Sequence, residues 1–116
     1  MTISSSLNAG VAGLQSNATR LASISDNIAN SSTYGYKRVQ TDFQSLVISS
    51  NGASYSAGGV RATTARLIDQ SGSLVSTSNA TDLAVRGRGM LPVAQASEIG
   101  VGNGTTQMNL TTTGSF

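Results

Sequence analysis

Apolar side chains recur at helical spacing over the first quarter of the chain. The spacing places them on one face of an α-helix, as at the a and d positions of a coiled coil. We call this row the apolar seam: Ile3, Leu7, Val11, Leu14, Ala18, Leu21, Ile24 and Ile28. The pattern predicts a helix from residue 3 to about residue 29, with Ser4, Ser5 or Ser6 as candidate caps.

The remaining faces of this predicted helix carry small, uncharged side chains, and only Arg20 and Asp26 are charged. A solvent-facing helix normally carries many Glu and Lys residues. Gly10 and Gly13 lower helix propensity but allow a neighbouring helix to approach closely. Two interpretations remain open: an amphipathic helix that covers a globular core, or a helix built for assembly. A membrane-surface helix is disfavoured because the polar face lacks Lys and Arg.

A turn and an arm are predicted to follow the helix. Residues 30–32 are Asn and Ser, whose side chains compete for backbone hydrogen bonds, and Gly35 can adopt a positive φ. Residues 41–48 are predicted to form a short helix or an extended arm. Residues 49–59 have the composition of a loop.

The second half of the chain is predicted to be rich in β-strands. Leu83 and Val85 alternate with polar or small residues, as one buried face requires. Residues 86–89 are a candidate turn or bulge, and Pro92 restricts its strand to a sheet edge. The candidate strands are 60–68, 73–77, 82–86, 89–94 and 108–113.

The residue inventory argues against catalysis. The chain of 116 residues contains no Cys, His or Trp, which removes thiol nucleophiles and imidazole bases or ligands. No two of its five acidic residues lie closer than 13 positions in the sequence. We therefore expect no catalytic residue, no metal site and no cofactor, and an enzyme is improbable.

Charge and hydropathy restrict the partners and the location. The net charge of +2 and the scattered basic residues argue against nucleic acid, and no apolar run approaches the ~20 residues of a membrane span. The N-terminus lacks the pattern of a cleaved signal peptide, so any export is expected to use another route. Ser and Thr exceed a quarter of the chain, so we expect little apolar burial and low stability without partners.

The segment from Asp26 to Arg38, DNIANSSTYGYKR, carries a resemblance to a known family. It resembles the N-terminal motif of flagellar axial proteins, which are the rod, hook and hook-associated subunits. The motif positions are Asn27, Ile28, Ala29, Asn30, Thr33, Gly35, Tyr36 and Lys37.

The resemblance continues into the β-rich half. Residues 81–89 resemble a strand–turn–strand of hook and distal-rod proteins, with Asp82, Leu83, Val85, Gly87 and Gly89 at its marked positions. The last four residues, TGSF, resemble the end of a following hairpin. Two departures stand out: residues 90–92 replace an aromatic pair, and no C-terminal helix follows to pair with the N-terminal one. The chain is thus expected to be part of a longer protein or a truncated product.

The resemblance implies an α+β fold with a coiled-coil-type assembly helix (1–31), a turn and connecting arm (32–70) and an incomplete β domain (71–116). It implies a structural subunit of the hook that polymerises with its own copies, meets rod and hook-associated subunits, and transmits torque in the flagellum. In the family the terminal helices line the export channel, and small side chains such as Ser16 and Ser23 suit such a wall. The alternatives are a distal-rod or hook-associated subunit, or a secreted Ser/Thr/Gly-rich surface protein, which would predict repeats that the sequence lacks.

Overall fold

The structure is a computed structural model that describes residues 2–46, 58–97 and 107–116. The chain divides into two compact units. The first contains residues 1–32 and 37–67, and the second contains residues 33–36 and 68–116.

The first unit begins with a single long helix, α1, which spans Ile3–Ala29. The sequence predicted this helix correctly, but its cap is Thr2 and none of the three serines. The Thr2 hydroxyl accepts a hydrogen bond from the Ser5 N–H at 3.2 Å, and the Ser5 hydroxyl in turn accepts from the Thr2 N–H. At the other end the Asn30 N–H donates to the Asp26 carbonyl at 3.0 Å, which closes the last turn.

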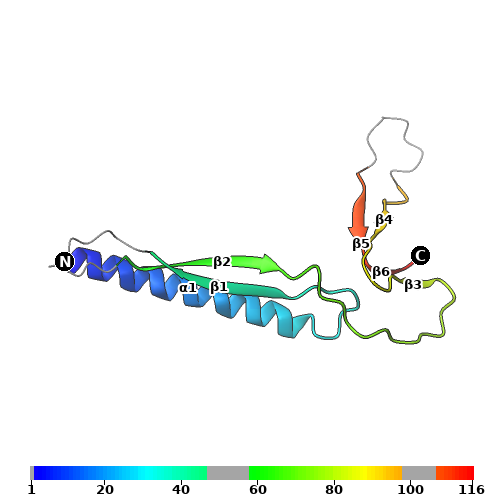
Figure 1. Cartoon of the computed structure of the whole chain (residues 1–116), viewed down its shortest axis with the longest axis horizontal. Coiled ribbons are helices and arrows are strands. Elements are labelled where there is room, and N and C mark those ends of the chain that lie inside the picture. Colours follow the sequence, from blue (N-terminus) through cyan, green and yellow to red (C-terminus); the bar gives the residue numbers. More distant parts are fainter. Residues whose placement is uncertain (1, 47–57, 98–106) are drawn as a thin grey trace. The chain divides into compact units, whose positions relative to one another are not determined.

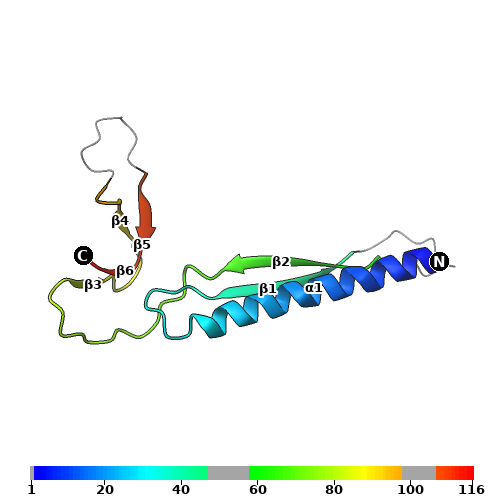
Figure 2. The same ribbon diagram turned by 180° about the vertical axis from the view of Figure 1, so that it is seen from behind.

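Two antiparallel strands complete the first unit. β1 (Val39–Ser45) pairs with β2 (Val60–Arg66), with Val39 opposite Arg66 and Ser45 opposite Val60. Figures 1 and 2 show this hairpin running alongside α1 from both viewing directions. Of the two predictions for residues 41–48, the extended one is correct as far as residue 46. The predicted loop at 49–59 lies outside the described residues except for its last two positions.

The second unit contains two separate two-stranded antiparallel sheets. β3 (Asp82–Ala84) pairs with β6 (Thr113–Ser115), and β4 (Leu91–Val93) pairs with β5 (Asn109–Thr111). β4 is therefore an edge strand, as Pro92 requires. The turn at residues 86–89 joins strands of two different sheets, because β3 pairs with the end of the chain and not with β4.

Two expectations for the second unit are wrong. Residues 73–77 form no strand, since Leu74 and Val75 are exposed and find no pairing strand within the described residues. Leu83 remains 51% exposed, so the predicted buried face does not form there. No hydrophobic side chain in the described part of the chain is fully buried. The class is α+β, as predicted, but the apolar surface is not gathered into a core.

Candidate functional site

The β1–β2 hairpin lies against a row of small and polar side chains on α1. Apart from Gly13, the positions of α1 that are partly or fully shielded from solvent recur at intervals of three or four residues. We call them the hairpin face: Ser5, Ala9, Ala12, Ser16, Thr19, Ser23 and Asn27. At its centre Ser16 is only 5% exposed. Gly59 (φ +80°) comes so near the helix that an added Cβ would lie 3.4 Å from the Ala12 Cβ.

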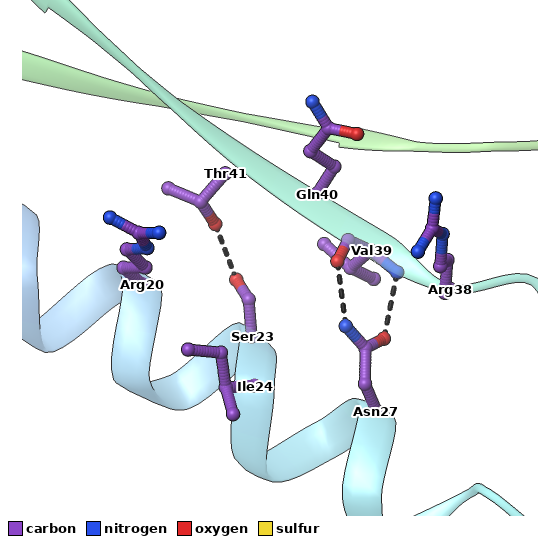
Figure 3. A pocket seen from close by; sticks show the side chains of 8 residues that line it. All are labelled: Arg20, Ser23, Ile24, Asn27, Arg38, Val39, Gln40 and Thr41. Atoms are coloured by element: carbon purple, nitrogen blue, oxygen red, sulfur yellow. Dashed lines mark hydrogen bonds between the residues drawn. The ribbon is translucent and has the colours of Figure 1, made fainter.

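Side-chain hydrogen bonds hold the hairpin to this face (Figure 3). The Asn27 amide makes two bonds to one residue: its Nδ2–H donates to the Val39 carbonyl at 2.7 Å, and its Oδ1 accepts from the Val39 N–H at 2.8 Å. One turn earlier, the hydroxyls of Ser23 and Thr41 lie 2.7 Å apart. The Asn27 side chain thus replaces a strand neighbour for Val39 and fixes where β1 starts along the helix.

The apolar seam lies on the opposite side of α1. Leu14 and Ser16 are two positions apart, which at about 100° per residue separates them by about 200° around the axis. From Leu7 to Ile28 the large side chains of the seam are between 44% and 73% exposed. Ala18 is exposed as well. The hairpin therefore shields the polar side of the helix, and no described residue covers the apolar side.

This arrangement changes two sequence-based interpretations. An amphipathic helix that covers a core would turn its seam inward, and α1 does the reverse. The hypothesis that Ser16 and Ser23 form part of a channel wall also does not fit their placement. Ser16 is buried, with its hydroxyl 3.4 Å from the Val60 carbonyl, and Ser23 is bonded to Thr41.

A shallow groove runs between α1 and the start of β1, with a volume of ≈ 190 Å³. Arg20 and Ile24 line it from the helix, and Arg38 lines it from the strand side. The Arg20 guanidinium carbon lies 5.6 Å from the centre of the Phe43 ring, which is a cation–π distance. This groove could not be predicted from the sequence, because its residues come from segments that meet only in the fold.

The structure divides the 26–38 motif between the two units. Asn27 lies on the hairpin face, Ile28 belongs to the seam, and Ala29 ends the helix before Asn30 closes it. Residues 33–36 cluster with the second unit. From Lys37 onward the chain belongs to the first unit again.

Gly35 shows why the motif needs a glycine at this turn. Its φ is +75°, as the sequence predicted, and the Tyr36 N–H donates to the Thr33 carbonyl at 3.3 Å. A Cβ at Gly35 would collide with the Thr113 side chain of β6. Sequence reasoning missed Thr113, whose hydroxyl also donates to the Leu83 carbonyl at 3.1 Å.

The predicted residues of the 81–89 turn do not form one cluster. Asp82 starts β3, and hydrogen bonds from Thr77, then from Ser115 and Asn79, hold the pKa of its carboxyl below the ordinary value. Beyond it, the Val85 N–H donates to the Thr112 carbonyl at 2.9 Å. Gly87 and Gly89 follow in the link between the two sheets, and a Cβ at Gly87 would meet no atom within 4 Å. Their role as a functional set stays a prediction.

Within residues 2–46, 58–97 and 107–116 there is no group of three acidic, His or Cys side chains that could hold a metal ion. No helix in that part of the chain has the length and apolarity of a membrane span.

Comparison with known sequences bears on the seam and the motif together. The family described as flagella basal body rod protein matches residues 7–37, which include the seam from Leu7 onward and every marked position of the motif. The flagellar hook protein of Caulobacter vibrioides is 44% identical over 99 residues, a stretch that includes 84% of this chain. Over most of its length, this chain is similar in sequence to flagellar hook proteins.

Other flagellar axial proteins are also similar. The hook protein of Rhizobium meliloti is 38% identical over the whole chain, and a flagellar basal-body rod protein of Caulobacter vibrioides is 30% identical over 102 residues. The chain spans only 17% and 27% of the two hook proteins and 39% of the rod protein. No solved structure matches the chain. The family resemblance inferred from residues 26–38 is confirmed.

Proposed function

We propose that this chain is the N-terminal part of a structural subunit of the bacterial flagellar hook. The subunit polymerises with its own copies, meets rod and hook-associated subunits at the ends of the polymer, and transmits torque. The observation that carries the proposal is the 38–44% identity to hook proteins across a segment whose helix exposes its entire seam. The activity is mechanical, so the chain needs interfaces and no reacting groups.

The apolar seam is the contact surface in this proposal. Soluble monomers rarely expose a contiguous apolar stripe of this length, and such stripes mark interaction sites. Because the hairpin already shields the opposite face, a helix docked on the seam would leave only narrow flanks of α1 in water. That enclosure accounts for a helix with only two charged residues.

Charges placed on the seam test the proposal. We expect Leu14→Glu with Leu21→Glu, made in the full-length protein that contains this chain, to abolish hooks in a strain lacking its own hook protein. Hooks are counted by electron microscopy, and motility is measured as swimming diameter. The matched control is Asn8→Glu with Gln15→Glu, which has the same spacing on an exposed flank. Normal hooks in the seam variant would refute the proposal.

The rod is a second candidate site of assembly. It is favoured by the match to the basal body rod family and by the 30% identity to a rod protein. Expression of the full-length protein in strains lacking either the hook protein or the distal-rod protein separates the two. Rescue of the hook-deficient strain supports the hook, whereas rescue of the rod-deficient strain alone assigns the chain to the rod.

We place the protein in the flagellum, at the hook and basal body, and propose that export leaves α1 intact. The seam runs through α1 from its first turn, so a cut within this helix would remove contact surface. The intact mass of the secreted protein checks this: loss of seam residues from the exported form would contradict it.

A further inference from the structure

The groove between α1 and the start of β1 is lined by two arginine side chains (Figure 3). Arg20 lines it from the helix and Arg38 from the residue that precedes β1. Ser23 and Asn27 lie between them and are bonded to the hairpin, so the groove lies where side-chain hydrogen bonds hold the hairpin to α1.

Neither guanidinium has a carboxylate partner in the described part of the chain. Of the two acids in the first unit, Asp26 lies six residues beyond Arg20, which is about 240° around the helix axis. The other, Asp42, accepts a hydrogen bond from the Gln40 side chain at 2.9 Å. The unit has five basic residues against these two acids, so the groove keeps an uncompensated positive charge.

The groove opens beside the apolar seam. Ile24 belongs to both, because it is a seam residue, 44% exposed, and also lines the groove. A helix lying along the seam would pass its flank over the groove. Asn27, which is bonded to Val39, lies seven residues after Arg20, or about 10 Å along α1, and Arg38 directly precedes Val39.

We propose that the groove receives carboxylates from a helix docked on the apolar seam, with two acidic residues about two turns apart that pair with Arg20 and Arg38. The inference rests on the proposed function, because it requires a helix on the seam. A second copy of α1 is not that partner, since α1 contains a single acid, Asp26. The partner is a different helix, acidic on one flank and apolar on its contact face.

The test uses the 116-residue chain and three labelled synthetic helices matched in length to α1. Each has a Leu seam and carries Glu, Gln or Lys at two flank positions seven residues apart. Fluorescence anisotropy measures the Kd of each peptide for the wild type and for Arg20→Glu with Arg38→Glu. We expect the wild type to bind the Glu peptide ~10-fold more tightly than the Gln peptide, as two partly desolvated ion pairs would produce. The difference should shrink in high salt.

The charge-reversed chain should prefer the Lys peptide over the Glu peptide, which also shows that the variant still folds. Equal binding of the Glu and Gln peptides to the wild type overturns the inference and leaves the seam as an uncharged docking surface. Failure of the chain to bind any of the peptides overturns the docking on which the proposed function itself depends. The two failures are therefore distinguishable.

Discussion

At the scale of single residues, Asn27 has the most specific part in the first unit. Its amide satisfies both backbone groups of Val39, and Asp cannot do so because it has no N–H to donate. We expect Asn27→Asp and Asn27→Ala each to weaken the attachment of the hairpin by about 1–3 kcal/mol. The measurement is hydrogen exchange at the Val39 amide, which should become faster.

The matched control for this prediction is Asn17→Ala. The Asn17 amide donates only to the Gly13 carbonyl within its own helix, at 3.1 Å. Exchange at Val39 should therefore not change in the control. An Asn27→Ala chain with unchanged Val39 protection would show that the hairpin is held by other contacts.

Gly35 has a positive φ, and the side chain of Thr113 lies close to it. We expect Gly35→Ala to destabilise the second unit, since Ala has a backbone cost of about 1–2 kcal/mol at positive φ and its Cβ collides with Thr113. Thr113→Ser removes the colliding methyl and keeps the hydroxyl that donates to Leu83. The double variant should recover part of the loss in urea unfolding, and strictly additive effects would contradict the proposed collision.

We expect Asp82 to make the stability of the second unit depend on pH. Its pKa is held below the ordinary value by hydrogen bonds to the carboxylate from Thr77, Ser115 and Asn79. A depressed pKa means that the charged form stabilises the fold above the unfolded-state pKa, and that this contribution is lost as pH falls through the folded pKa. The protection factor of the Phe116 amide, which donates to the Thr81 carbonyl beside it, should fall in acid in the wild type once the intrinsic pH dependence of amide exchange is divided out. Asp82→Asn should remove most of that acid dependence.

At the scale of elements, the two sides of α1 differ, since the hairpin covers one side and no described residue covers the other, to which Gly10 belongs. It lies between Leu7 and Leu14 on the seam, and an added Cβ would meet nothing within 4 Å. We expect Gly10→Ala to raise the helicity of the chain through a propensity gain of up to about 1 kcal/mol, measured by circular dichroism. Gly10→Leu should also raise helicity but block hook assembly, because its side chain would fill the space for the partner helix.

Asn8→Leu provides the control, since it adds the same side chain to an exposed flank of the same helix. It should leave assembly intact. A Gly10→Leu protein that builds normal hooks would mean that no partner helix comes close at this position.

The sequence predicted α1 well because its period is strong, and it predicted the positive φ of Gly35 from the residue type. It could not predict which side of α1 the hairpin covers. Apolar periodicity marks a seam, whereas the hairpin is held by Ser16, Ser23 and Asn27, residue types that are also common on solvent-exposed faces. The pairing of Leu83 with Gly114 could not be predicted for a related reason. The local sequence of distant, Thr-rich segments says little about which strands pair and in which register.

At the scale of the whole chain, the described residues contain no fully buried hydrophobic side chain. The apolar burial that normally offsets the conformational entropy of folding is therefore largely absent until the seam is covered. We expect the isolated chain to show a broad, weakly cooperative thermal transition by circular dichroism. The same chain bound to a helix that covers the seam should melt cooperatively and at higher temperature, because burying one Leu or Ile side chain contributes about 1.5–3 kcal/mol. A sharp, strongly helical transition of the isolated chain would contradict this account. Stability would then come from within the chain, and the exposed seam would not be needed to complete the fold.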